Sequence, residues 1–150
     1  EEYFQRSLFY GVYPSMFSGH TSYRDIAYFS NPEWYNRDRH LFVKYIPLIR
    51  RVDFAGWQPV PYADIEPAGI RIERYGSWEK GNLAFTLHNT TNKSASAKLT
   101  LMRKELELPE KVSVEEWIKK PVAAKTEGSK LYLTLELPAN GYAVVAISGQ

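Results

Sequence analysis

Ser15, His20 and Asp25 are residue types that cooperate in nucleophilic catalysis, and they lie close together in the sequence. In such a group the serine oxygen attacks the substrate, the histidine takes its proton and the aspartate orients the histidine. A nucleophilic serine often lies on a sharp turn between a strand and a helix, within a G-x-S-x-G pattern. Ser15 lies instead in "VYPSMF", so the sequence does not favour a catalytic triad.

Paired carboxylates are a second possible chemistry, because hydrolysis of a glycosidic bond uses two of them about 5 to 10 Å apart. The N-terminal candidates are Asp25, Glu33 and Asp38. Glu33 and Asp38 lie on a predicted helix, where Glu33 can pair with Arg37, so we expect surface or capping roles for both. The acids of the C-terminal part alternate with lysines and predict a solvated sheet face: Glu73, Glu79, Glu105, Glu107, Glu115, Glu116 and Glu136.

Metal ligands would have to come from three histidines and the acids, because the chain has no cysteine. His20, His40 and His88 are isolated, and none belongs to a short spacing that places two ligands on one face of an element. We therefore expect no metal site and no cofactor.

Two short patterns match the acceptor sequence for N-glycosylation, Asn89-Thr90-Thr91 and Asn92-Lys93-Ser94. Such patterns are frequent by chance, and the same residue types form tight turns. We interpret this stretch as a turn between two strands.

The charges are balanced, with 19 basic and 17 acidic residues and a net charge of +2. This gives no electrostatic argument for binding nucleic acid or an anionic membrane. Apolar stretches are interrupted well before the roughly 20 residues that a membrane span needs, and "EEYFQRS" lacks the basic start of a signal peptide. We expect a soluble chain whose targeting segment, if any, lies outside this sequence.

A long helix is predicted from Asn31 to Phe54. Asn31 is a favourable N-cap, and Pro32 suits the first helical position. Apolar residues then recur with helical spacing, and Gly56 can end the helix. Pro47 is expected to kink it, because proline removes one backbone hydrogen bond.

A shorter helix is predicted over residues 1–11, with Phe4, Leu8 and Val12 on one stripe. Gly11 and Pro14 end it, and "VYPSMF" is interpreted as a short extended segment. Because no capping residue precedes this helix, we expect it to continue from a structure outside the chain.

After "GWQPVPYADIEPAG" the apolar period changes from about 3.6 to 2. The segments "GIRIERYG", "NLAFTLHN", "SAKLTLM" and "KLYLTLELPANGYAVVAIS" predict half-buried antiparallel strands separated by turns. The predicted fold is mainly β: an antiparallel β-sandwich of the Greek-key type, preceded by two helices. We place the helical segment at residues 1–57 and the sandwich at residues 58–150.

Aromatic residues are concentrated in residues 1–60. One interpretation is that they pack on the sandwich, as proposed for Trp34, Phe42, Tyr45, Phe54 and Trp57. The favoured interpretation is that a second set packs on protein absent from this chain, since large uncovered apolar surfaces mark interfaces. That set is Tyr3, Phe4, Phe9, Tyr10, Tyr13 and Phe17.

The order of "RSLFYGVYPSMFS", "NPEWYNRDRHLFVKYIPLIRRV", "AGWQPVPYA", "GNLAFTLHNTT" and "LYLTLELPANGYAVVAI" resembles the C-terminal end of a glycoside hydrolase. In such enzymes a catalytic (β/α)8 barrel, or TIM barrel, is followed by an antiparallel β-sandwich. The resemblance implies that residues 1–11 form a late barrel helix, "VYPSMFS" the last barrel strand and its loop, and residues 31–54 the final barrel helix.

The same resemblance implies a structural role for this chain as an accessory domain of a carbohydrate-active enzyme. The catalytic carboxylates come from earlier barrel strands, so no catalytic residue is expected here. Loops after barrel strands line the active site, and Ser15, Phe17, Ser18 and His20 would contact substrate in a complete barrel. The expected partners are the remainder of the barrel, in the same polypeptide or in a separate chain, and carbohydrate.

Two alternatives remain open. The first is a carbohydrate-binding module in which an exposed aromatic ring stacks on a sugar, the candidates being Tyr75, Trp78, Trp117 and Tyr132. The second is an interaction subunit that docks its aromatic-rich helices on another chain.

Overall fold

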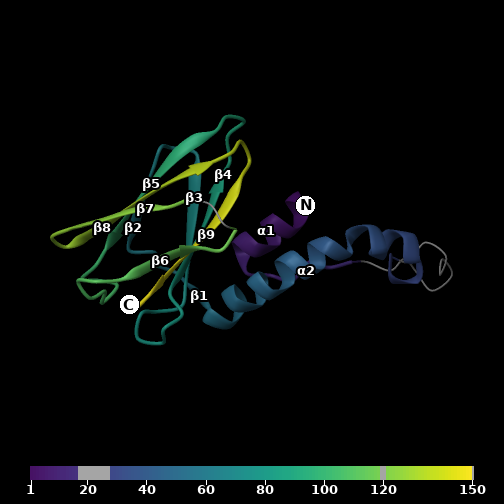
Figure 1. Cartoon of the computed structure of the whole chain (residues 1–150), viewed down its shortest axis with the longest axis horizontal. Helices are drawn as coiled ribbons and strands as arrows, with labels where there is room; N and C mark the ends of the chain where they lie inside the picture. Colours follow the sequence, from purple (N-terminus) through teal and green to yellow (C-terminus); the bar gives the residue numbers. More distant parts are fainter. Residues whose placement is uncertain (17–27, 119–120, 150) are drawn as a thin grey trace.

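The computed structural model describes residues 1–16, 28–118 and 121–149, which form two α-helices and two antiparallel sheets (Figure 1). The helices are α1 (Glu2–Tyr10) and α2 (Pro32–Ala55), and a short 3-10 helix, η2 (Tyr28–Ser30), precedes α2. The strands are β1 (Trp57–Gln58), β2 (Ala63–Glu66), β3 (Ile70–Tyr75), β4 (Ala84–Asn89), β5 (Ala95–Met102), β6 (Ser113–Glu116), β7 (Ala123–Glu127), β8 (Lys130–Leu137) and β9 (Tyr142–Ser148).

The strands confirm the predicted antiparallel sandwich. One sheet has the order β1-β3-β4-β9-β6 and the other the order β2-β5-β8-β7. Strands that are distant in sequence pair at the centre of each sheet, β4 with β9 and β5 with β8, as Greek-key connections require. The asparagine turn is also confirmed: Asn89 is buried, and its side-chain amide donates to the carbonyl oxygens of Lys93 and Pro138.

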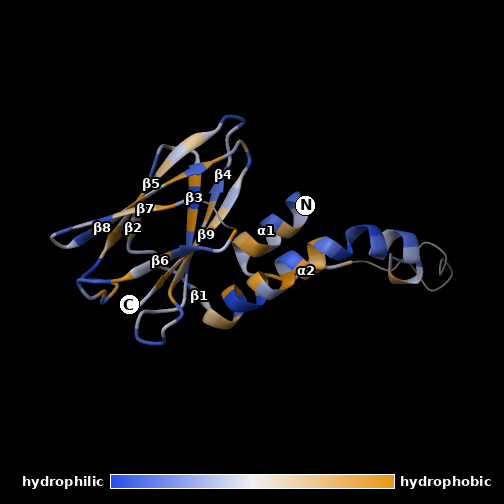
Figure 2. Ribbon diagram, in the orientation of Figure 1, coloured by the Kyte–Doolittle hydropathy of each residue, from blue (hydrophilic) through white to orange (hydrophobic). Residues whose placement is uncertain are grey.

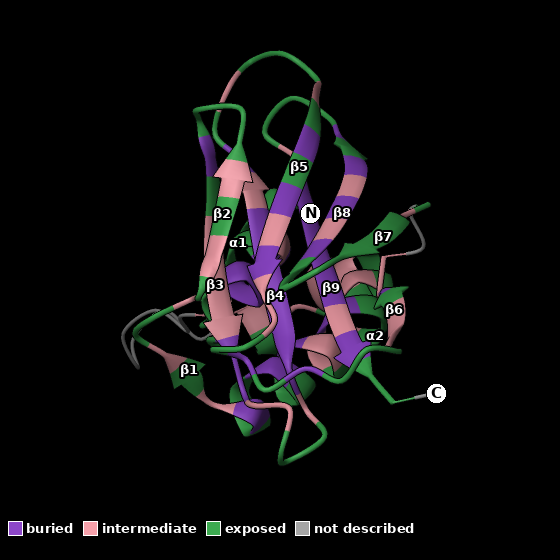
Figure 3. Cartoon of the chain, turned by 90° about the vertical axis from the view of Figure 1, so that its left-hand side faces the viewer, coloured by how far each residue is buried: buried purple, intermediate pink, exposed green. Residues whose placement is uncertain are grey.

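The core between the sheets follows the predicted alternation. Leu83, Phe85 and Leu87 face it from one sheet, and Leu99 and Leu101 face it from the other. Figure 3 shows buried residues along β4, β5, β8 and β9, whereas β7 is exposed over its whole length. The prediction of half-buried strands is wrong for β4 and β9, because five of the six residues of β4 and five of the seven residues of β9 are buried, on one face or the other.

The second face of β4 is buried because the helices cover it. Phe4, Leu8, Tyr45, Ile49 and Val52 form a second apolar cluster with Tyr75, Ala84 and Val144 of the five-stranded sheet. The molecule therefore has three layers, namely helices, five-stranded sheet and four-stranded sheet (Figure 1). Figure 2 shows hydrophobic and hydrophilic residues alternating along α2, as one covered and one uncovered side require.

Helix α2 begins and ends where the sequence predicts. The side chain of Asn31 accepts a hydrogen bond from the backbone N–H of Glu33, and Gly56 is the C-cap. The helix continues through Pro47, which lies on the exposed side together with Val43, whose carbonyl would otherwise bond the missing N–H. Water can hydrate that carbonyl, so the helix is not interrupted.

Helix α1 ends at Gly11, which adopts a left-handed φ of 61°. The backbone N–H of Gly11 donates to Leu8 and that of Val12 donates to Ser7, which closes the last turn. A Cβ atom at Gly11 would lie 2.9 Å from the ring of Tyr75, so glycine also allows the close approach of α1 to the sheet.

Candidate functional site

The residues predicted to border a substrate follow α1. Phe17, Ser18 and His20 lie outside the described residues, as does Asp25 of the possible triad. Ser15 is exposed, and its backbone is held by Tyr3: the Ser15 N–H donates to the Tyr3 hydroxyl at 2.8 Å, and this hydroxyl donates to the Ser15 carbonyl at 3.0 Å. The structure thus fixes the position of Ser15 relative to α1.

The aromatic residues of α1 and of the segment that follows it divide into two groups. Phe4 and Phe9 are buried within the chain, so the prediction that they pack on absent protein is wrong for these two. Tyr3, Tyr10 and Tyr13 are exposed by almost half of their surface. Phe4 and Leu8 of the predicted stripe therefore face the chain's own sheet, whereas the prediction is wrong for Val12, which lies beyond the helix and is exposed.

The aromatic residues of α2 and β1 divide in the same way. Tyr45 is buried against the sheet, and Phe42 packs beside it. The ring of Phe54 is 87% exposed and Trp57 is also exposed, so the expectation that these two pack on the sandwich is wrong. Both lie where α2 ends and the first strand begins.

The acids of α2 are held locally. Arg37 makes two hydrogen bonds of 2.8 Å to Asp38, and not the predicted pair with Glu33. Tyr28 donates a further hydrogen bond to Asp38 at 2.9 Å. Arg37, followed by Tyr28, lowers the pKa of Asp38 to about 2, so this carboxyl is ionised at neutral pH and is unsuited to act as an acid.

A buried polar contact joins α1 to the five-stranded sheet. The hydroxyls of Tyr75 and Thr86 both donate to the carbonyl oxygen of Phe9, at 2.9 Å and 2.8 Å. This carbonyl belongs to the last turn of α1, where no intrahelical donor is available. Burial raises the pKa of Tyr75, which therefore stays protonated and able to donate.

His88 lies beside this contact and stacks on Tyr142, with ring centroids 4.1 Å apart and an interplanar angle of 6°. Phe9 meets His88 edge-on at 5.7 Å. Burial, followed by the positive charges of Arg71 and Arg6, lowers the pKa of His88. The imidazole is therefore a neutral packing element between helix and sheet.

The far end of α2 carries an open apolar hollow of about 410 Å³, lined by Phe29, Tyr35, Arg39 and Phe42. In Figure 1 this end of α2 extends beyond the sandwich. Val43 is 69% exposed on the same helix. Phe29 and Val43 are thus exposed apolar side chains among the mostly polar residues of this uncovered side.

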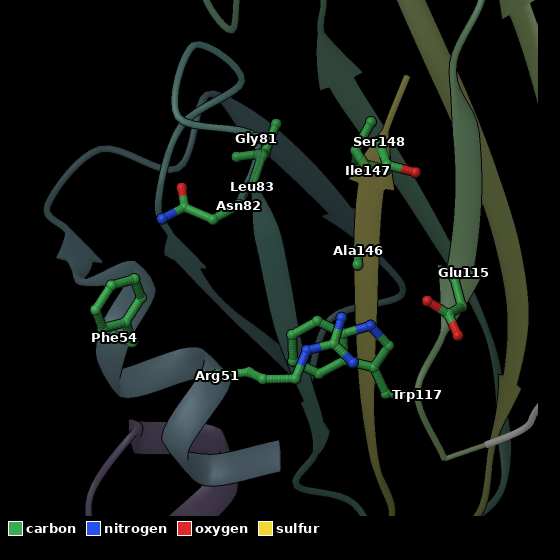
Figure 4. Close-up of a pocket in the computed structure, with 10 residues that line it drawn as sticks. All are labelled: Arg51, Phe54, Gly81, Asn82, Leu83, Glu115, Trp117, Ala146, Ile147 and Ser148. Carbon is green, nitrogen blue, oxygen red and sulfur yellow. The ribbon is translucent and has the colours of Figure 1, made fainter. Parts of the chain in front are cut away.

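A second hollow, a cleft of about 230 Å³, lies where the C-terminal end of α2 meets the five-stranded sheet (Figure 4). Arg51 reaches across it from α2, and its guanidinium lies 3.7 Å from the centre of the Trp117 ring. Glu115 of β6 and Asn82 border the cleft on other sides, and Ala146 and Ile147 of β9 line it together with Leu83. Four separate segments of the chain meet in this cleft.

No protein-family model, curated protein or solved structure matches the chain.

The predicted sugar-stacking residues are not equally placed. Tyr75 is 2% exposed, so the prediction that it stacks on a sugar is wrong. Trp117 has one face covered by Arg51. Trp78 and Tyr132 are half-buried. No candidate aromatic presents an open platform by itself.

The acids of the sheets are mostly exposed, as predicted, but Glu116 is not. It is buried at the end of β6 and accepts the backbone N–H of Val144 at 3.1 Å. In the part of the chain that the structure describes, no three His, Asp or Glu side chains are grouped so that they could hold a metal ion. Among the same residues, no helix is long and apolar enough to cross a membrane.

Proposed function

We propose that this chain is the C-terminal part of a carbohydrate-active enzyme, in which the sandwich supports a catalytic barrel and α1 and α2 form the seam. The observation that carries this proposal is the two-sided character of α2. One side is buried on the sheet through Tyr45, Ile49 and Val52, and the other presents Val43 and the hollow at Phe29 to solvent. Apolar side chains gathered on an uncovered helix end are a feature that interfaces share, and this supports a covered seam.

The segment after α1 also supports the proposal. Residues 12–16 belong to neither sheet, and Val12 and Tyr13 are exposed. An extended segment beside two helices would become a barrel strand once neighbouring strands pair with it. In that arrangement Ser15, with Phe17, Ser18 and His20, would lie at the substrate side.

The role proposed for the chain itself is mechanical. Barrel closure requires that the outer helices be held in place, and α2 is fixed to the sandwich along its C-terminal half by a shared apolar cluster. Catalysis would come from carboxylates on the other strands of the barrel. The chain alone is proposed to be inactive.

The test compares the 150-residue chain with the polypeptide extended by all upstream coding residues. Val43→Asp changes stability by less than about 0.5 kcal/mol in the short chain, because an exposed residue tolerates charge. In the extended polypeptide the same change costs about 3 kcal/mol or more, because it buries an unpaired charge at the seam. Ala123→Asp on exposed β7 is the matched control and leaves both proteins unchanged in thermal unfolding.

Two results would contradict the proposal. The first is an equal, small effect of Val43→Asp in both polypeptides. The second is a reading frame that begins near Glu1, which would favour a separate subunit that docks the same helices on another chain. Hydrolysis of a panel of aryl glycosides by the extended polypeptide, but not by the short chain, tests the enzymatic part directly.

A further inference from the structure

The turn between β8 and β9 carries a chemically labile pair, Asn140 followed by Gly141. The side-chain amide of an asparagine can be attacked by the backbone nitrogen of the next residue, which closes a five-membered imide ring. A side chain on that next residue hinders the attack, so glycine, which has none, allows the fastest reaction. Of the six asparagines in the sequence, Asn140 is the only one followed by glycine.

The geometry of the turn requires both residues. Asn140 has a left-handed φ of 53°, a conformation that asparagine adopts more readily than most residues. A Cβ atom at position 141 would lie 2.7 Å from Cδ of Pro138 and 2.8 Å from its carbonyl oxygen, so this close approach needs glycine. The labile pair therefore cannot be exchanged for a larger second residue without strain in the turn.

In the folded chain the attacking nitrogen is engaged in a hydrogen bond. The N–H of Gly141 donates to the carbonyl oxygen of Pro138 at 2.9 Å. Ring closure requires this nitrogen to lose its proton and to reach Cγ of Asn140, so the hydrogen bond has to break first. The N–H of Asn140 donates to the carbonyl oxygen of Thr91 at 3.0 Å, which ties the turn to the one between β4 and β5. The closed turn therefore slows the reaction.

Asn89 holds the same turn from inside the sandwich. This residue is buried, and its backbone N–H donates to the carbonyl oxygen of Gly141 at 2.9 Å. Its side-chain amide donates to the carbonyl oxygen of Pro138, also at 2.9 Å. The two acceptors lie on either side of Asn140, so a change in the length of the main chain at that residue would displace one of them. A buried donor at Asn89 would then lose its partner, which is costly.

We propose that Asn140 is a deamidation site that the closed turn protects, and that its conversion to isoaspartate disrupts this end of the sandwich. The Gly141 nitrogen forms a bond to Cγ of Asn140, the Cγ–Nδ2 bond breaks, and ammonia leaves with the proton of the Gly141 N–H. Water then opens the imide at either of its two C–N bonds, which gives aspartate or isoaspartate. Isoaspartate adds one methylene group to the main chain, so Asn89 can no longer reach both acceptors. This inference does not depend on the proposed function.

The experiment incubates the 150-residue chain at weakly alkaline pH, in buffer and in denaturing urea. Mass spectrometry follows each asparagine-containing peptide, and chromatography separates the isoaspartyl from the aspartyl form. We expect Asn140 to convert at least about tenfold more slowly in buffer than in urea, because a turn held by several hydrogen bonds is open in fewer than about one molecule in ten. Asn36 and Asn82, each followed by a larger residue, convert more slowly than Asn140 in urea and serve as internal controls.

A matched variant separates the effect of the new charge from that of the longer main chain. Asn140→Asp carries the same charge on an unaltered main chain, and aspartate also adopts the left-handed conformation, so its unfolding temperature stays at the wild-type value. The side chain at this position is exposed, so the charge itself is tolerated. Chain that has been converted to isoaspartate in urea and then refolded unfolds at a lower temperature than Asn140→Asp.

Three results would overturn the inference. One is conversion of Asn140 at the same rate in buffer and in urea, which would show that the closed turn gives no protection. Another is no conversion of Asn140 in urea, or faster conversion at a different asparagine. The third is an isoaspartyl chain that unfolds at the same temperature as Asn140→Asp, which would show that the longer main chain does not disturb the contact with Asn89.

Discussion

The carbonyl oxygen of Phe9 accepts two side-chain hydrogen bonds, from Tyr75 and Thr86, in a buried contact between helix and sheet. A carbonyl in the last turn of a helix needs a donor from elsewhere, and water cannot reach this one. Two donors from neighbouring strands therefore fix both the position and the rotation of α1 on the sheet.

The contribution of these two donors to stability can be measured by removing them separately and together. Tyr75→Phe and Thr86→Val each cost about 1 kcal/mol, because the other hydroxyl still satisfies the carbonyl. The double variant costs more than the two combined, by about 1 kcal/mol or more, because the carbonyl is then buried without a donor. Urea unfolding measures all three, and Tyr10→Phe, at an exposed tyrosine, is the control; strict additivity would contradict the shared carbonyl.

The half-buried His88 makes the stability of the folded chain depend on pH. Its pKa in the folded chain lies below the ordinary value of 6.5, through burial and then the charges of Arg71 and Arg6, with Glu2 opposing them. The unfolded chain therefore binds more protons below about pH 6.5, and stability falls as the pH decreases from there toward the folded pKa. Above pH 6.5 the contribution is fully present.

The measurement is thermal unfolding across this window. The wild-type chain loses stability between about pH 6.5 and the folded pKa, whereas His88→Gln is flatter over the same range. A histidine C–H resonance titrating above 6.5 in the folded chain, assigned by its absence in His88→Gln, would show that the sign is wrong.

At the scale of elements, α2 begins with a capping interaction and ends against the sheet. Its outer half extends beyond the sandwich, so its N-terminal turns depend on local interactions more than on packing (Figure 1). Asn31 provides the cap, and η2 packs just before it.

Asn31→Ala removes that cap and is expected to cost about 1 kcal/mol. Because the outer turns have little tertiary support, the loss appears first as fraying of the N-terminal turns, seen as faster hydrogen exchange of the amides of residues 33–36. Asn31→Asp, which keeps an acceptor at the cap, is the control. Equal effects of both substitutions would mean that the cap does not hold this end of the helix.

At the scale of the whole molecule, strand positions with clear alternation could be predicted from sequence, and the two-layer sandwich with them. β3, β4, β5, β8 and β9 all carry that signal. The short strands β1 and β2 lie in a proline-rich stretch without a regular apolar pattern. Strand β7 has no buried residue and hence no apolar period. Nothing in a single-sequence pattern marks such edge strands.

The helix layer that covers the five-stranded sheet could also be predicted, although not from the alternation of apolar and polar residues. The run "YAVVAIS" of β9 is apolar on both faces, which indicates cover on both sides. The cleft had no comparable signal, because Arg51, Glu115, Trp117 and Asn82 come from segments that only the tertiary structure brings together.

Because both faces of β4 and β9 are covered, we expect these strands to be the last to unfold. A strand with buried side chains above and below cannot open locally, because any opening exposes two apolar layers at once. Its amides should exchange only when the whole molecule unfolds, whereas exposed β7 can separate from β8 at little cost. The middle of the five-stranded sheet is therefore the cooperative centre of this protein, and the helices contribute to its stability although they lie outside the sandwich.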